Sequence, residues 1–128
     1  MEQFTQDLYE AARNGDTTAV KDLLAAGADP NYINDDGYMP LHMAAREGNV
    51  DTIKILCEVT SDINRQGNDG DTPLYYAARA GSFDGVKTLL EYGADPTIAN
   101  ERGETPESIA KEKGYNDIVT FLYELRDH

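Results

Sequence analysis

Residues 70–81 read Gly-Asp-Thr-Pro-Leu-Tyr-Tyr-Ala-Ala-Arg-Ala-Gly. Thr72 is a hydroxyl residue of the kind that caps helices, and Pro73 has a fixed backbone torsion that suits the first helical position. Leu74 and the two central alanines follow at helical spacing, and Gly81 is typical of a helix end. The stretch therefore predicts a short helix of about two turns.

A second helix is expected to follow at about residues 83–92. Val86 and the two leucines after it form an apolar stripe at helical spacing, and Gly93 can adopt the left-handed conformation that ends helices. Residues 94–103 are rich in turn formers and predict an extended loop with a tight turn. The unit thus consists of two helices and a projecting loop.

This unit recurs along the chain at a step of 33 residues. The recurring positions form a glycine, an alanine, a leucine and a β-branched series: Gly15, Gly48, Gly81 and Gly114; Ala11, Ala44, Ala77 and Ala110; Leu23, Leu56, Leu89 and Leu122; Val20, Ile53, Val86 and Val119. Four units are expected, at about 1–33, 34–66, 67–99 and 100–128, within a single domain over 1–128. A unit this small cannot bury its own apolar stripes, so neighbouring units must stack into an all-helical solenoid.

Two stretches of the chain resemble the ankyrin repeat. Residues 37–48, Gly-Tyr-Met-Pro-Leu-His-Met-Ala-Ala-Arg-Glu-Gly, and residues 70–81 are similar to its Thr-Pro-Leu-His-x-Ala half. Residues 23–31 and 89–95 are similar to its second half. The resemblance covers essentially the whole chain and implies an all-α ankyrin-repeat solenoid of helix-turn-helix units with projecting β-hairpin-like loops. The repeat is a scaffold for many partners, so the fold alone does not specify the function.

The terminal units are expected to act as caps of a stand-alone array. Unit 1 lacks the loop that precedes the first helix, and unit 4 carries polar residues such as Lys111 and Lys113 on its first helix. Polar outer faces are what terminal repeats need for solubility. A monomer is the default expectation.

The composition indicates an acidic intracellular protein. The chain carries 24 acidic and 11 basic residues, for a net charge of −13, which disfavours direct binding to nucleic acid. No apolar run is long enough to span a bilayer, and the N-terminal residues do not resemble a secretory signal. Cys57 is the only cysteine, which suits a reducing compartment, cytoplasmic or nuclear.

No catalytic arrangement is evident in the sequence. It contains no nucleophile elbow, glycine-rich phosphate loop or His-x-x-x-His pair, and too few histidines and cysteines for a structural zinc site. His42 is expected to form structural hydrogen bonds in its turn, and Cys57 to be a buried apolar residue. The chain is therefore predicted to be no enzyme and to need no cofactor or metal.

The resemblance implies that a partner protein binds the concave face, made of the loop tips and the first helices. Carried over by position, the candidate partner-binding residues are Arg13, Asp35, Asp36, Tyr38, Met43, Arg46, Glu47, Asn68, Asp69, Asp71, Tyr76, Arg79, Arg102 and Glu104.

Within this set, Arg13, Arg46 and Arg79 form a row at single repeat steps, beside an acidic fringe at the loop tips. Tyr38, Met43 and Tyr76 are the candidate anchors, because aromatic residues and arginine are enriched at interface hot spots. The acidic fringe suits a partner with a basic segment. Tyr76→Ala and Arg79→Glu are expected to weaken binding with little change in melting temperature.

Two alternatives stay open at this point. The arginines can simply pair with neighbouring carboxylates, the surface charge then serving only solubility. A second functional class, an acidic mimic of nucleic acid that occupies a nucleic-acid-binding protein, is also compatible with the charge.

Unit 2 departs from the pattern at two helix ends and is predicted to be the weakest internal unit. Met39 stands where the pattern has threonine, so a side-chain cap worth on the order of 1 kcal/mol is lost. Thr60 stands where units 1 and 3 have Gly27 and Gly93, so either a β-branched residue is strained there or the turn differs locally. Met39→Thr and Thr60→Gly are expected to raise stability.

Overall fold

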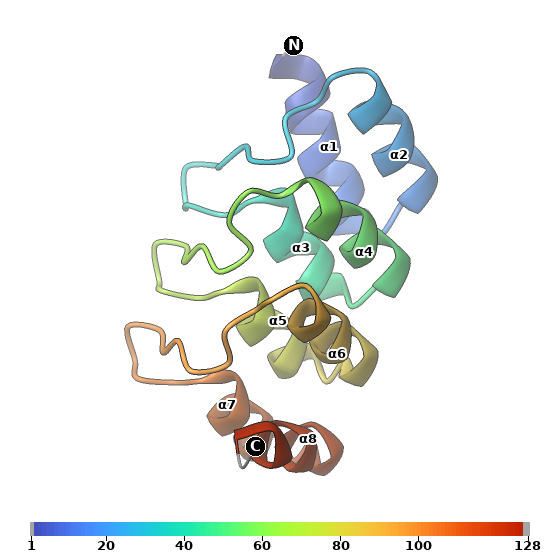
Figure 1. The fold of residues 1–128 in the computed structure, drawn as a ribbon. Helices are drawn as coiled ribbons and strands as arrows, with labels where there is room; N and C mark the ends of the chain where they lie inside the picture. The colour runs from blue at the N-terminus through green and yellow to red at the C-terminus, as the bar shows by residue number, and fades with distance from the viewer. Residues whose placement is uncertain (1, 127–128) are drawn as a thin grey trace.

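A computed structural model describes residues 2–126, and these residues form helices with no β-strand among them. The helices alternate between a first and a second helix of each unit (Figure 1). The first helices are α1 (Glu2–Asn14), α3 (Pro40–Glu47), α5 (Pro73–Ala80) and α7 (Pro106–Lys113). The second helices are α2 (Thr17–Ala25), α4 (Val50–Val59), α6 (Phe83–Glu91) and α8 (Asn116–Arg126).

The first helices of the inner units begin and end at the residues that the sequence predicts. The Thr72 side chain accepts a hydrogen bond from the Tyr75 backbone N–H at 3.1 Å, and Pro73 is the first helical residue of α5. Gly81 ends α5 in the left-handed conformation, with φ of 78°. A side chain is disfavoured at such a φ, so glycine is the residue that suits this turn.

Met39 starts α3 without a side-chain cap, as the sequence predicts. The His42 ring still forms the reciprocal half of a capping box, because its Nδ1 accepts a hydrogen bond from the Met39 backbone N–H at 2.9 Å. The His42 backbone N–H, which a threonine at position 39 would cap, donates to Met39 O at 3.1 Å. The Met39 side chain itself is 2% exposed and lies in the core. Met39 therefore stabilises unit 2 by packing in the core, whereas Thr72 at the equivalent position of unit 3 stabilises that unit by capping the helix.

The second helices of units 1 to 3 begin at polar caps and end in two different ways. Units 1 and 3 close with a backbone hydrogen bond, from Ala28 N–H to Leu23 O and from Ala94 N–H to Leu89 O, each at 3.0 Å. In unit 2, Thr60 is extended, with φ of −84° and ψ of 129°. The turn after α4 thus differs locally and carries no left-handed strain, which is the second of the two options open from the sequence.

The two helical layers bury the recurring apolar positions between them. In Figure 1 the first helices stack along the long axis of the molecule and the second helices stack beside them. Ala44, Ala77 and Ala110 are fully buried, as are Ile53 and Val86. Small side chains on the first helices allow neighbouring units to pack closely, which explains the alanine series.

The loops between units, here called fingers (residues 26–39, 60–72 and 92–105), project from the same side of the stack (Figure 1). Each finger folds back on itself through a short backbone pair: in the second, Gly67 N–H bonds Asp71 O at 3.0 Å and Gly70 N–H bonds Gly67 O at 2.9 Å. The fingers are thus hairpin-like turns without assigned strands. Across residues 2–126, no helix has the length and apolar character needed to cross a membrane.

Candidate partner-binding face

The fingers are tied to one another by backbone hydrogen bonds. Asn68 N–H donates to Asp36 O at 2.9 Å, and Glu101 N–H donates to Asp69 O at 3.0 Å. The Asn68 side-chain amide also donates to Asp35 O at 3.1 Å. Adjacent finger tips are therefore fixed relative to each other, so the acidic fringe sits on a connected edge.

Two asparagines, 66 residues apart, organise the first and third fingers in the same way. Asn34 Oδ1 accepts hydrogen bonds from the backbone N–H groups of Asp36 and Tyr38 at 3.0 and 2.9 Å. Asn100 Oδ1 accepts from those of Arg102 and Glu104, both at 2.9 Å. Side-chain to backbone bonds of this kind replace the missing strand ladder in a short loop.

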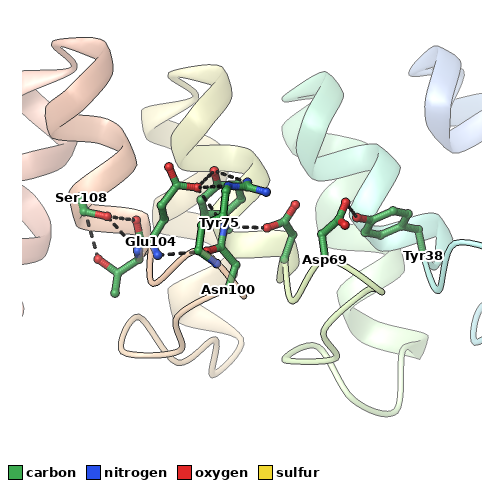
Figure 2. A network of polar contacts seen from close by, with 9 residues as sticks. Tyr38, Asp69, Tyr75, Asn100, Glu104 and Ser108 are labelled. Atoms are coloured by element: carbon green, nitrogen blue, oxygen red, sulfur yellow. Dashed lines mark hydrogen bonds and ion pairs between the residues drawn. The ribbon is translucent and has the colours of Figure 1, made fainter.

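The second finger has Gly67 at this position, and the Tyr38 ring occupies the vacated space. A Cβ atom added to Gly67 would collide with the ring, with Tyr38 Cζ only 2.7 Å away. The Tyr38 hydroxyl reaches across to donate to Asp69 Oδ2 at 3.1 Å (Figure 2). Burial, together with Tyr76 and Asp69, raises the pKa of Tyr38.

Equivalent positions on the first helices reach the finger of the following unit through different chemical groups. Tyr9 OH accepts from Asn34 Nδ2 at 2.8 Å, and Tyr75 OH donates to Glu104 Oε1 at 2.8 Å. Between them in the series, His42 Nε2 lies 3.1 Å from Asp71 O. One register position therefore anchors all three fingers to the helices.

His42 is held as a neutral ring by these contacts. Its Nδ1 must accept, because the Met39 backbone N–H is the donor, so the proton sits on Nε2 and faces the carbonyls of Arg65 and Asp71 at 2.9 and 3.1 Å. The ring is fully buried. Burial lowers the pKa of His42 to about 4. The hydrogen bonds at both ring nitrogens are those expected of a structural histidine in this turn.

A polar network surrounds Glu104 at the base of the third finger (Figure 2). Its Oε1 accepts from Asn100 Nδ2 at 3.0 Å, from Tyr75 OH at 2.8 Å and from Arg102 Nε at 3.0 Å. The bonds from Asn100 and Tyr75 are the main cause of a pKa lowered to about 2. Asn100 also donates to Asp71 Oδ1 at 2.9 Å.

Three hollows follow one another along the first helices, and neighbouring hollows share lining residues. The first, about 170 Å³, is lined by Arg13, Met43, Arg46 and Glu47. The second, about 390 Å³, is lined by Arg46, Tyr76, Arg79 and Ala80. The third, about 400 Å³, is lined by residues of α5, α7 and two fingers: Tyr76, the cations Arg79, Arg102 and Lys113, and the carboxylates Asp69, Asp71, Glu104 and Glu112 are among them. This row of hollows is called the groove below.

The arginine row differs along its length. Arg13 approaches Glu10 at 3.7 Å, with both side chains 57% exposed, so this pair contributes little to stability. Arg46 and Arg79 are exposed, and neither forms an ion pair among the described residues. Pairing with neighbouring carboxylates therefore does not account for these two arginines.

The structure divides the fourteen candidate residues by depth. Tyr38, Met43 and Asp71 are buried, at 8%, 4% and 3% exposure. Tyr38 and Met43 pack in the core, and the Asp71 carboxylate accepts from Asn100. Met43 and Asp71 contribute only a small exposed area to the walls of the first and third hollows. Asn68, Asp69, Arg102 and Glu104 hold the fingers together. The exposed candidates that line the groove or its acidic edge are Arg13, Asp35, Asp36, Arg46, Glu47 and Arg79.

Tyr76 belongs to α5, is half-buried, and lines the second and third hollows of the groove. Its ring centre is 5.6 Å from that of Tyr38, 6.1 Å from that of His42 and 6.0 Å from that of Tyr75, in edge-to-face arrangements. Such contacts stabilise the fold, so Tyr76→Ala is expected to lower the melting temperature, contrary to the expectation from sequence. Variants at Arg46 and Arg79 are cleaner probes of the groove.

Sequence reasoning missed Tyr75 and Asn100 as organisers of the fingers. The repetition of Asn34 at Asn100 was available as a signal, whereas the contact of Tyr75 with Glu104 spans 29 residues and is not visible in the spacing. Cys57 is buried, and burial raises its thiol pKa to about 12, as expected of an apolar core residue. No cluster of His, Cys, Asp or Glu within the described residues has an arrangement suited to a metal ion.

Comparison with known families identifies one match. A family model described as ankyrin repeats, in three copies, matches residues 8–100. A search of curated proteins gave no match. The matched region contains the three fingers up to Asn100 and both central arginines of the groove.

Proposed function

Because the chain belongs to the ankyrin-repeat family, whose repeats are generally protein–protein interaction modules, we propose that it is an adaptor or inhibitor that binds a partner protein in the groove. The residues that bear on the partner are Arg46 and Arg79 in the groove and the acidic finger tips at Asp35 and Asp36. In this role the protein catalyses no reaction and needs no cofactor. It acts inside the cell.

The observation that carries this proposal is the continuity of the groove. Arg46 lines both the first and the second hollow, and Tyr76 and Arg79 line both the second and the third. A row of hollows with shared walls suits an elongated partner segment better than a small molecule, since such a segment can contact neighbouring hollows in turn. Arginine and tyrosine are also the residue types enriched at binding hot spots.

The rigidity of the face supports the same proposal. Backbone bonds join the finger tips, and Tyr9, His42 and Tyr75 anchor the fingers to the helices. A surface that is ordered before binding loses little conformational entropy when the partner docks. The acidic finger tips would speed the encounter with a basic part of the partner and contribute less to the final affinity.

Mimicry of nucleic acid is not favoured by an observation in the structure. The exposed acidic residues of this face are interspersed with cations, Arg46 and Arg79 in the middle hollow and Arg102 and Lys113 in the third, which interrupt any phosphate-like track. A mimic would depend steeply on salt because its affinity comes from many charges. The test below therefore includes a salt series.

The test is affinity capture of cellular proteins with three baits. The first is the wild-type chain and the second is the groove variant Arg46→Gln/Arg79→Gln. The third is the matched control Lys54→Gln/Lys87→Gln, which removes the same charge from exposed positions one repeat step apart on α4 and α6. Retained proteins are identified by mass spectrometry at low and high salt.

A partner that binds the groove is retained by the wild type and the control and is lost from the groove variant. Retention that is equal on all three baits, or loss from the control alone, contradicts the assignment of the groove. A partner retained at least as well by both variants, which are more acidic than the wild type, but lost from all three baits at high salt would instead favour the charge-driven mimic.

A further inference from the structure

We propose that the hollow between Arg46 and Arg79 receives an acidic side chain of the partner, so that the groove selects a peptide segment carrying an acidic residue beside basic ones. This inference rests on the proposed function and specifies the chemistry of the segment. In this inference Arg46 and Arg79 bind a carboxylate of the partner, whereas the acidic finger tips bind its basic residues.

The first argument is the local charge of this hollow. Its lining residues, Arg46, Tyr76, Arg79 and Ala80, include two cations and no carboxylate. The adjoining hollow contains Glu47 beside its arginines, whereas the equivalent position one repeat later is Ala80. Arg79 also borders the third hollow, whose lining includes carboxylates, but neither Arg46 nor Arg79 forms an ion pair among the described residues. The middle hollow is therefore a local cationic site in a chain with a net charge of −13.

The second argument is that other roles do not explain the pair. Arg46 and Arg79 lie in the last turns of α3 and α5, where a cation interacts favourably with the helix dipole. That interaction needs a positive charge near each helix end, and lysine supplies it in α7 through Lys111 and Lys113. It does not require two guanidinium groups to line one hollow.

The third argument concerns the shape of the donor groups. A guanidinium presents parallel N–H donors that match the two oxygens of a carboxylate, and arginine is favoured where such groups are recognised. Two guanidinium groups beside the half-buried Tyr76 ring therefore form a site for a partner carboxylate. The open hollow of about 390 Å³ has room for an acidic side chain.

The charge of the rest of the molecule restricts which kind of partner segment can carry the bound carboxylate. A polyanion would be repelled by the acidic tips at Asp35 and Asp36 and by the overall charge. A peptide with basic residues next to its acidic one avoids this repulsion, since its bases face the tips while its acid reaches Arg46 and Arg79. The opposite charges of the tips and the hollow would also fix the direction in which the segment lies.

The experiment selects short random peptides displayed on phage against the wild-type chain, the Arg46→Gln/Arg79→Gln variant and the Lys54→Gln/Lys87→Gln control. Each selected peptide is then made with its acidic residue as Glu or as Gln, and affinities for all three proteins are measured by fluorescence anisotropy. Circular dichroism melts verify that the variants are folded.

The proposal expects selected peptides to combine basic residues with an acidic one. On the wild type and the control, Glu→Gln in the peptide should weaken binding about tenfold or more, as for a hot-spot contact. On the groove variant the same change should matter by less than about twofold, because the partner of the carboxylate is gone.

Two results would overturn the inference, and they can be told apart. Peptides that require Arg46 and Arg79 but carry no acidic residue, or whose Glu→Gln change costs the same on the groove variant, would refute the carboxylate site and leave the proposed function standing. Selection that yields no peptide dependent on the groove would refute both.

Discussion

At the residue scale, Tyr38 and Gly67 share one space between the first two fingers. The first and third fingers use an asparagine where the second has Gly67, and the Tyr38 ring fills the position that a Cβ would need. The two residues are therefore coupled across 29 positions. The Tyr38 ring requires a glycine at position 67, and the absence of a side chain at Gly67 leaves room for the ring.

Gly67→Ala is expected to destabilise the wild-type chain by about 2 kcal/mol, because the added methyl overpacks the space against the ring. In a Tyr38→Ala background the ring is gone, and the same change should cost less than about 1 kcal/mol. Urea unfolding of the four proteins in this double-mutant cycle measures the coupling. Equal costs of Gly67→Ala in both backgrounds would show that the two residues are independent.

His42 makes stability depend on pH. Its pKa is about 4 in the folded chain and about 6.5 when unfolded, so the unfolded state binds the proton first as the pH falls. Stability from the neutral ring is complete above the unfolded pKa and declines toward the folded one. Between pH 7.5 and 5 the loss should be about 2 kcal/mol.

Urea unfolding across this pH range, with His42→Gln as the comparison, checks the prediction. The variant should be less stable at pH 7.5, because its hydrogen bonds to Met39 and Asp71 are impaired, but its stability should change little as the pH falls. Parallel pH profiles for the two proteins would contradict the assignment to His42.

The residues that the sequence predicts correctly are those whose structural role is local. The cap at Thr72, the helix end at Gly81 and the burial of Cys57 follow from neighbouring residues and periodicity. The burial of each side chain was harder to predict. The resemblance assigns a position to a face of the solenoid, but it does not distinguish the buried Tyr38 from the exposed Arg46. Whether a residue is buried depends on which side chains of the next unit pack against that residue.

At the element scale, the departures of unit 2 have compensating interactions. Thr60 lies in an extended conformation, its hydroxyl donates to Leu56 O at 2.6 Å, and Ser61 N–H donates to Asn31 Oδ1 at 2.8 Å. Unit 3 also bonds its preceding finger, from Asp95 N–H to Asn64 Oδ1 at 2.8 Å, in addition to its closing bond. The Thr60 hydroxyl is therefore the interaction that is particular to unit 2. The sequence left this choice open because both turns are compatible with the residues present.

Thr60→Gly is therefore expected to lower stability by up to about 1 kcal/mol, opposite in sign to the expectation from sequence alone. The glycine removes a hydroxyl hydrogen bond and makes the unfolded chain more flexible. Gly93→Thr, at the equivalent position with φ of 96°, is the matched control and should cost about 1 to 2 kcal/mol or more. Thermal melts compare them, and a raised midpoint for Thr60→Gly would mean that the turn is strained after all.

The structure also reverses the expected sign at Met39. Threonine would add a helix cap worth about 1 kcal/mol, but it would remove a buried methionine side chain worth about 1.5 to 3 kcal/mol. Met39→Thr should therefore lower the free energy of unfolding by about 1 kcal/mol, and Thr72→Ala should lower it by a similar amount through loss of a cap alone. Urea unfolding measures both, and a gain in stability for Met39→Thr would show that the cap outweighs the packing.

At the scale of the whole molecule, the stacked helices and the joined fingers present one long face. The alanine series lets the first helices stack closely (Figure 1). The contacts of Tyr9, His42 and Tyr75 hold the fingers against these helices, and Figure 2 shows the contact of Tyr75 with Glu104. The groove then follows from repetition, since one arginine position recurs at each step until Glu112 replaces it in unit 4. Its chemistry is set by the few positions where the units differ, such as Ala80.

The central claim is that a partner protein occupies this groove. Hydrogen–deuterium exchange of the chain, free and bound to the captured partner, tests it most directly, because each peptide reports which backbone is shielded. Protection concentrated in the finger tips and the C-terminal turns of α3 and α5, with α4 and α6 unchanged, is the predicted result. Protection confined to α4 and α6, with the fingers exchanging as in the free chain, would place the partner on the opposite layer and contradict the account.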